Sequence, residues 1–226
     1  MIKRFVFALL SSALVTSVAH AGGHCAAGKT LTDGKLTIAT GNPAYYPWVM
    51  DDAPESGKGF EAAVAYAMAS EMGFSAADVV WVRTSFDEAI QPGAKNFDLN
   101  MQQYSITPER EIVVDFSVPY YSAPMAVLVG KGAVDTAPNM ADLKGLKWGA
   151  VGSTTAVSKL ENVVKPESAI LLYADNADVN AAISANQIDA ALFDLPTALF
   201  LSAVMIEGSK VIGQFSADAS DNPDQF

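Results

Sequence analysis

The chain has few of the residues that most often supply catalysis or crosslinks. Its 226 residues contain one cysteine, Cys25, and two histidines, His20 and His24, all close to the N-terminus. One cysteine excludes a disulfide within this chain, so we expect Cys25 to be free or to await a partner that this chain lacks. The sequence contains no cysteine set for zinc, no HExxH and no dinucleotide fingerprint. We therefore expect neither a metal nor a cofactor.

Basic residues are also scarce. The chain has 14 lysines and arginines against 25 aspartates and glutamates, and its formal net charge is −11. This charge repels the phosphates of nucleic acids and the surface of anionic membranes, so nucleic acid is not an expected partner. The content of hydrophobic residues is 50% and that of charged residues 17%. This composition indicates a globular protein large enough to bury one large core or two smaller ones.

Long apolar runs are absent except at the N-terminus. Lys3 and Arg4 precede an apolar run at residues 5–18, which ends in the small-x-small sequence Ala-His-Ala at residues 19–21. This pattern predicts a cleaved signal peptide over residues 1–21 and export to the periplasm. The alternative, a membrane anchor, is less favoured because the run is shorter than the roughly 20 residues that span a bilayer.

Two series of alternating strands and helices follow. The first series has expected strands at 35–39, 79–83 and 97–101, a helix at 60–72 closed by Gly73, and a short helix after Ser85. The second has expected strands at 147–151, 169–173 and 188–193, and helices at 154–164, 176–186 and 195–206. Such alternation favours parallel strands with crossover helices.

An apolar strand at residues 125–129 lies between the two series, and a second extended segment occupies 210–215. We therefore expect two α/β lobes joined by two extended crossings. The first lobe would comprise residues 33–126 together with the returning segment 213–226, and the second lobe residues 127–212.

Arg110 occupies an unusual position for a cation. Thr107 is a good N-cap and Pro108 suits the first helical position, which puts Arg110 in the first turn of a short helix. That end of the helix dipole disfavours positive charge, so the arginine is expected to serve something other than helix stability. An arginine close to apolar residues needs an anion, either a neighbouring carboxylate or one from outside the chain. The neighbouring candidates are Glu109, Glu111 and Asp115.

The stretch from Ser105 to Tyr121, SITPEREIVVDFSVPYY, resembles the signature of bacterial extracellular solute-binding proteins that serve amino-acid ABC importers. Further motifs follow the order of that family, and the resemblance covers residues 33–215. These motifs are Gly59–Glu61, Asn96–Asp98, Ala141–Gly145, Ala150–Thr155 and Gln187–Asp194.

The resemblance implies a two-lobed venus-flytrap fold, type II. It implies a monomer that captures a free, zwitterionic amino acid between hinged lobes and delivers it to an ABC permease in the inner membrane. Rival readings are a cyclohexadienyl-type dehydratase on the same scaffold and a ligand-sensing domain. Catalysis is disfavoured because the expected lobes contain no histidine for acid–base work. Members of the family normally continue past the end of this chain, so we expect the first lobe to lack C-terminal elements.

The resemblance also assigns the core of the site. Arg110 would take the α-carboxylate as a bidentate pair, with the Ser105 hydroxyl adding to the site and Thr154 helping to hold the carboxylate. Ser153 is a further candidate, because the free backbone N–H groups of the turn that it shares with Thr154 are expected to face the cleft. Asp194 would receive the ammonium group. Two local alternatives remain compatible with these roles: Ser153 can cap the helix that follows it, and Asp194 can cap the helix that begins at Leu195.

The remaining candidate site residues come from the turn after the first expected strand and from the segment before Ser105. They are Asn42, Tyr45, Trp48 and Gln103. Asn42 stands where an aspartate is common in the family, and Gln102 with Gln103 replaces small or hydroxylated residues. Amide groups suit polar ligand ends, so we expect an amino acid with a polar side chain. For Tyr46 and Trp48, packing between lobes is an equal alternative to a site role.

Overall fold

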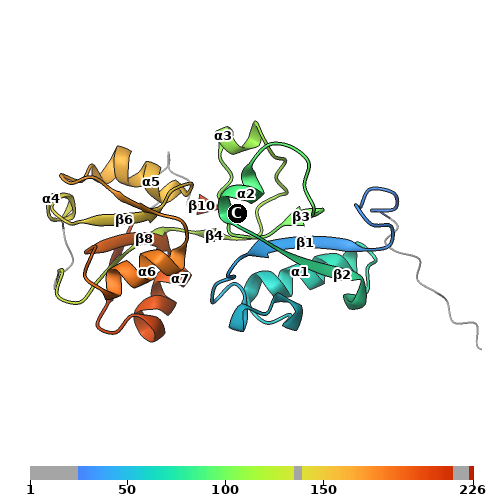
Figure 1. The fold of residues 1–226 in the computed structure, drawn as a ribbon, viewed down its shortest axis with the longest axis horizontal. Helices are drawn as coiled ribbons and strands as arrows, with labels where there is room; N and C mark the ends of the chain where they lie inside the picture. The colour runs from blue at the N-terminus through green and yellow to red at the C-terminus, as the bar shows by residue number, and fades with distance from the viewer. Residues whose placement is uncertain (1–24, 135–138, 216–223) are drawn as a thin grey trace, which may run out of the picture.

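The computed structural model describes residues 25–134, 139–215 and 224–226. The expected signal peptide at residues 1–21 lies outside these ranges. The described chain forms two α/β lobes that lie side by side, each built on its own sheet (Figure 1). Within the described ranges, no helix combines the length and apolar character needed to cross a membrane.

The first lobe contains a three-stranded parallel sheet with the order β2-β1-β3. Its strands are β1 (Leu36–Gly41), β2 (Val79–Thr84) and β3 (Leu99–Asn100). Its helices are α1 (Phe60–Glu71), α2 (Phe86–Ile90) and α3 (Pro108–Glu111), with short 3-10 helices at Met50–Asp52, Pro54–Ser56 and Ala76–Asp78. The core forms where Leu36 and Ile38 of β1 pack with Ala65 and Ala69 of α1. Gly73 follows α1 with φ of 89°, a left-handed conformation that suits glycine after a helix.

The second lobe contains a five-stranded sheet with the order β7-β6-β8-β5-β9. Its strands are β5 (Met125–Val129), β6 (Trp148–Val151), β7 (Leu171–Tyr173), β8 (Ala190–Asp194) and β9 (Lys210–Gln214). Its helices are α4 (Met140–Lys144), α5 (Thr155–Lys159), α6 (Asn176–Ser184) and α7 (Leu195–Phe200). Single π-helical turns at Leu160–Val164 and Leu201–Met205 extend α5 and α7.

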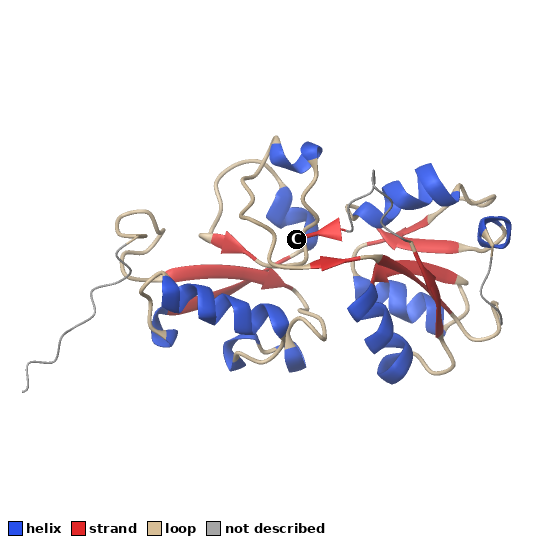
Figure 2. Ribbon diagram, turned by 180° about the vertical axis from the view of Figure 1, so that it is seen from behind, coloured by secondary structure: helices blue, strands red, loops and turns tan. Residues whose placement is uncertain are grey.

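Helices cover both faces of this sheet (Figure 2). Because side chains alternate along a strand, Val127 and Val129 of β5 pack on the side of α5, whereas Ala126 and Leu128 pack on the side of α6 and α7. All five residues of β5 are buried. This two-sided burial explains why β5 reads as a continuous apolar run.

The parallel arrangement expected for the three strands of the second series is confirmed, but one expectation about a crossing between the lobes was wrong. The sheet is mixed: β6 runs parallel to β7 and β8, but β5 is antiparallel to both β8 and β9. The segment expected to cross between the lobes at residues 210–215 instead forms the edge strand β9, and Phe215 N–H donates to the carbonyl of Met125 at 2.8 Å. A strand as apolar as β5 is best buried with a neighbour on each side, and β9 supplies the second one.

A two-stranded ribbon lies between the lobes in both views (Figures 1 and 2). It pairs β4 (Ser122–Ala123), which leads through Pro124 into β5, with β10 (Asp224–Gln225) in antiparallel fashion. Phe226 follows β10, and its carbonyl accepts hydrogen bonds from the N–H groups of Tyr120 and Tyr121, both at 2.9 Å. Its ring is buried against Trp48 and Ala123. The last described residues are thus joined to the first lobe.

Candidate functional site

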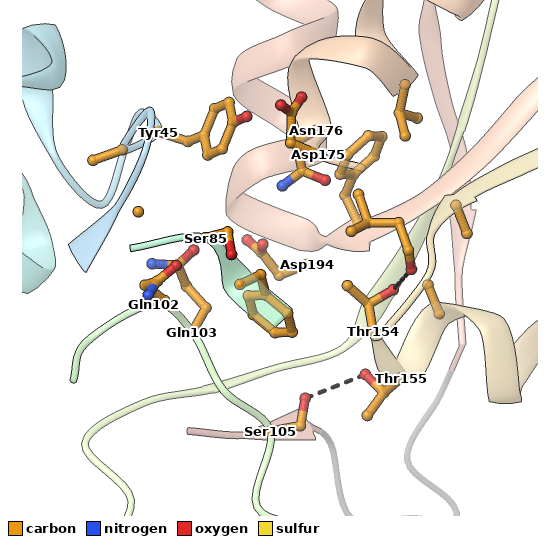
Figure 3. Close-up of a pocket in the computed structure, with 18 of the residues that line it drawn as sticks. Tyr45, Ser85, Gln102, Gln103, Ser105, Thr154, Thr155, Asp175, Asn176 and Asp194 are labelled. Carbon is orange, nitrogen blue, oxygen red and sulfur yellow. Dashed lines mark hydrogen bonds between the residues drawn. The ribbon is translucent and has the colours of Figure 1, made fainter. Parts of the chain in front are cut away.

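A cleft with a volume of about 230 Å³ is lined by residues of both lobes. Most of its polar lining follows the carboxyl ends of strands, the usual place for ligands in α/β folds. The first lobe contributes Asn42, Tyr45, Ser85, Phe86, Gln102, Gln103, Ser105 and Arg110. The second lobe contributes Thr154, Thr155, Asp175, Asn176 and Asp194. Figure 3 labels the polar side chains of this lining apart from Asn42 and Arg110, and it shows them gathered from both lobes.

Direct contacts join the lobes around this cleft, so the described conformation is a closed one. The hydroxyl groups of Ser105 and Thr155 lie 3.2 Å apart (Figure 3). On the opposite side, the Tyr45 hydroxyl accepts a hydrogen bond from Ala177 N–H at 3.1 Å. Near the ribbon, Trp48 Nε1 donates to Thr197 Oγ1 at 2.9 Å.

Arg110 is fixed by the local structure that its sequence predicts. Thr107 caps α3 by accepting from Arg110 N–H through its hydroxyl at 3.3 Å. The guanidinium donates through Nη1 to the carbonyl of Ser105 at 2.8 Å and through Nη2 to that of Ser153 at 2.9 Å. Its central carbon lies 5.1 Å from the centre of the Tyr104 ring, within cation–π range. These contacts hold a positive charge at one end of the cleft.

Asp194 caps a helix, as the sequence suggested, and also lines the cleft. It ends β8 and caps α7, because its Oδ1 accepts from Thr197 N–H at 2.9 Å. The carboxyl group also lines the cleft. Burial raises the pKa of Asp194, with the hydrogen bonds from Thr197 acting in the opposite direction. An ammonium group entering the cleft would therefore relieve a costly buried charge.

Glu61 forms a buried polar cluster behind the cleft wall, with only 1% of its surface exposed. Its Oε1 accepts from Gln103 N–H at 2.9 Å and from the Tyr120 hydroxyl, and its Oε2 accepts from the Gln103 side chain. Burial raises the pKa of Glu61 to about 7. Gln103 has φ of 53°, which is uncommon for a residue with a side chain. Glu61 thus holds part of the wall in a conformation that the backbone alone disfavours.

Gln102 presents a buried donor. The residue lines the cleft and is 8% exposed, and its side-chain Nε2 has no hydrogen-bond partner among the described residues. Burial of an unpaired amide costs free energy, which an acceptor brought by a ligand or by water recovers. The site therefore has capacity for a polar ligand beyond its charged groups.

The structure brings most of the predicted site residues together. Seven line the cleft: Asn42, Tyr45, Gln103, Ser105, Arg110, Thr154 and Asp194. Ser153 and Trp48 lie outside this lining. The Ser153 hydroxyl contacts Asp87, and the helix cap expected of Ser153 is wrong, because Thr154 occupies that position. Trp48 is buried beside Phe226.

Tyr46 and Trp48 both pack between the lobes, which was the alternative to a role in the site. Tyr46 stacks on Phe200 of α7 with 4.1 Å between ring centres, and Trp48 contacts Thr197 of the same helix. Sequence reasoning missed other lining residues, namely Ser85, Phe86, Thr155, Asp175 and Asn176. Thr155 belongs to the family motif Ala150–Thr155, which could have identified it. Asp175 and Asn176 lie at the start of the helix expected at residues 176–186, and polar residues at that position could have indicated a place in the cleft.

The described residues contain no group of three or more histidine, cysteine, aspartate or glutamate side chains placed to hold a metal ion. The lining of the cleft offers recognition by charge and hydrogen bonds. A cation at Arg110 and a carboxylate at Asp194 face one enclosed space, and amide and hydroxyl groups line the remainder.

Similarity to known proteins agrees with this arrangement. The chain is 29% identical to an L-arginine-binding protein of Pseudomonas aeruginosa over 67% of its length and 58% of that protein's. It is 30% identical to an octopine-binding periplasmic protein of Rhizobium meliloti over 81% of its length and 69% of that protein's. The chain thus spans only part of these relatives.

Among solved structures, an ancestral arginine-binding protein bound to glutamine superposes with a TM-score of 0.70 at 26% identity, over 86% of this chain and 83% of that one. An ancestral amino acid-binding protein described as a precursor of cyclohexadienyl dehydratase gives 0.67 at 28% identity, over 85% and 80%. Residues 36–196 match a family described as bacterial extracellular solute-binding proteins, family 3. The chain belongs to this family of two-lobed solute-binding proteins.

Proposed function

We propose that this protein captures a free amino acid between its lobes and delivers it to an ABC permease in the inner membrane. The observation that carries the proposal is that Arg110 and Asp194 line the same cleft from opposite lobes. An amino acid carries a carboxylate and an ammonium group on one carbon, so one molecule can satisfy both residues. Closing the lobes on a zwitterion would place an opposite charge of the ligand beside each of these residues, which favours closure when the ligand is bound.

The binding geometry follows from the present contacts. Arg110 donates to two backbone carbonyls, and a carboxylate is a stronger acceptor than either of them. The ligand carboxylate would therefore lie at Arg110 with help from the Thr154 hydroxyl, and Asp194 would accept from the ammonium group. The side chain would then extend toward Tyr45, Asp175 and Asn176, which lie across Asp194 from Ser105 and Thr154 in Figure 3.

The named relatives support an amino acid as the ligand. Proteins described as binding arginine, octopine and histidine are among them, and the octopine-binding relative is periplasmic. We further propose that residues 1–21 are a signal peptide and that the mature protein acts in the periplasm as a monomer. We also propose that the lobes divide just before Met125, two residues earlier than the expected boundary at 126 and 127, because all of β5 belongs to the second sheet.

A thermal-shift screen of the common amino acids tests the proposal. If a ligand with micromolar affinity is added at a hundredfold excess over its dissociation constant, it stabilises the fold by about 2.7 kcal/mol. For a chain of this size, that corresponds to a rise in melting temperature of roughly 5–10 °C. Failure of every amino acid to raise the melting temperature would contradict the proposal.

A dehydratase remains the second candidate, because a solved relative is a precursor of cyclohexadienyl dehydratase and because Glu61 and Asp194 have raised pKa values. Binding is favoured because the described residues contain no histidine, and Glu61 is enclosed behind the cleft wall. Incubation with a prephenate-like acid distinguishes the two: dehydration of the acid would support the enzyme, and an unchanged acid supports the binder.

A further inference from the structure

The lining of the cleft includes, at the start of α6, a charged residue that a simple zwitterion does not use. Asp175 lines the cleft immediately before α6, beside Asn176. Tyr45 of the first lobe faces it, and burial together with the negative charge of Asp175 raises the pKa of Tyr45 to about 12. Asp175 therefore presents its charge to a partly desolvated part of the cleft, where charge interactions are stronger than in open water.

The first turn of α6 already has acceptors for its exposed amide groups. Asp175 Oδ1 accepts from Asp178 N–H at 3.0 Å, and the Tyr45 hydroxyl accepts from Ala177 N–H at 3.1 Å. These bonds satisfy amides that would otherwise attract an anionic ligand group to the helix start. The end of the cleft at α6 is therefore suited to a cation and unsuited to an anion.

The charge balance of the lining leads to the same conclusion. Among the described residues, the charged side chains of the lining are Arg110, Asp175 and Asp194. The proposed function assigns the carboxylate and ammonium groups of the ligand to Arg110 and Asp194, so neither of these backbone groups pairs with Asp175. The nearby lining residues Asn42 and Asn176 are uncharged. A positive charge on the ligand side chain would complete the balance.

We propose that Asp175 makes this cleft selective for amino acids whose side chain carries a positive charge. The inference rests on the proposed function, since it assumes that Arg110 and Asp194 hold the backbone of an amino acid. The unpaired, buried Nε2 of Gln102 in the same lining is an independent sign that a polar ligand belongs there.

Calorimetric titration with L-arginine and L-citrulline tests the proposal, because the two amino acids have nearly the same shape and differ in side-chain charge. We expect arginine to bind the wild-type protein at least about tenfold more tightly than citrulline. Asp175→Asn should reduce this ratio to within about threefold, chiefly by weakening arginine binding. Asparagine caps helices as well as aspartate does, so this variant keeps the start of α6.

Asp178→Asn is the matched control. It removes a negative charge from the first turn of the same helix, but Asp178 is exposed and is not part of the lining, so the arginine-to-citrulline ratio should not change. Citrulline binding as tightly as arginine, or an unchanged ratio in Asp175→Asn, would overturn the selectivity while leaving amino-acid binding intact. If neither these two nor any other amino acid binds, the proposed function itself fails.

Discussion

The guanidinium of Arg110 on the first lobe donates a hydrogen bond to the carbonyl of Ser153 on the second lobe, with 2.9 Å between the two atoms. The same side chain donates to the carbonyl of Ser105 at 2.8 Å, within its own lobe. Arg110 is therefore a contact between the lobes, as well as the cation that we propose receives the ligand carboxylate. A substitution at this position should affect closure and ligand binding together.

The first prediction concerns Arg110→Ala. Loss of a charged partner inside a closed cleft typically costs about 3 kcal/mol, so we expect amino-acid affinity to fall by roughly a hundredfold. Arg110→Lys should recover little of it, because an ammonium group cannot reproduce the forked pair of donors. Calorimetric titration measures both variants. Lys144→Ala, which removes a positive charge from α4 outside the lining, is the control, and equal losses in both would refute the role of Arg110.

The second prediction concerns pH and Glu61. Its pKa is raised from 4.5 to about 7 in the folded protein, so the folded state holds a proton that the unfolded chain releases. This contribution to stability is complete below about pH 4.5 and is lost as the pH rises through 7. Between pH 5 and pH 8 the free energy of unfolding should fall by about 2–3 kcal/mol on this account.

Denaturant unfolding at several pH values checks the Glu61 prediction. In Glu61→Gln the carboxyl group is gone, so the decline over this window should be much shallower. Asp194 also has a raised pKa and contributes a decline of the same sign, which Glu61→Gln leaves in place. If wild type and Glu61→Gln show parallel pH profiles, Glu61 does not titrate in this window.

The third prediction concerns Gln102→Leu. The wild-type residue buries a side-chain nitrogen without a partner among the described residues, and leucine fills similar space without a polar atom. Removal of such a group should raise the free energy of unfolding by about 1 kcal/mol. Affinity for the amino acid should fall, because the variant lacks the side-chain nitrogen that would donate a hydrogen bond to the ligand. A variant that is more stable and binds equally well would show that Gln102 does not contact the ligand.

The fourth prediction concerns Phe226→Ala. The Phe226 ring is buried, lies edge-on to Trp48 at 5.2 Å between centres, and stacks on Tyr121 at 5.5 Å. Truncation of a buried phenylalanine usually costs 3–5 kcal/mol, and we expect about 3 kcal/mol here in denaturant unfolding. Ile112→Ala, at a side chain that is 83% exposed, should change stability by less than about 0.5 kcal/mol. Similar effects of the two substitutions would exclude a structural role for Phe226.

Features that depend on local chemistry could be predicted from the sequence. Thr107 and Pro108 start a short helix, Gly73 follows one in a left-handed conformation, and Asp194 caps α7, because each of these depends on residues within one turn. The family motifs added the two-lobed fold, and they led to residues such as Ser105 that the cleft does contain.

Features that depend on long-range packing could not be predicted in this way. The antiparallel placement of β9 depends on the burial of β5, which lies about eighty residues earlier in the chain. The left-handed backbone of Gln103 depends on the carboxyl group of Glu61, and the position of Asp175 in the cleft depends on how the lobes meet. Each of these relationships joins residues that are far apart in the sequence, so no short window of sequence contains it.

The hydrogen bond between Trp48 and Thr197 has a practical consequence. The chain has three tryptophans, and this is the one whose indole nitrogen bonds to the opposite lobe. Trp81 donates to Tyr66 within the first lobe, and Trp148 donates to Leu143 within the second, so rotation of one lobe against the other leaves their surroundings unchanged. Opening of the cleft should therefore alter the fluorescence emission of Trp48 alone, which gives the unlabelled protein a built-in optical probe of its hinge.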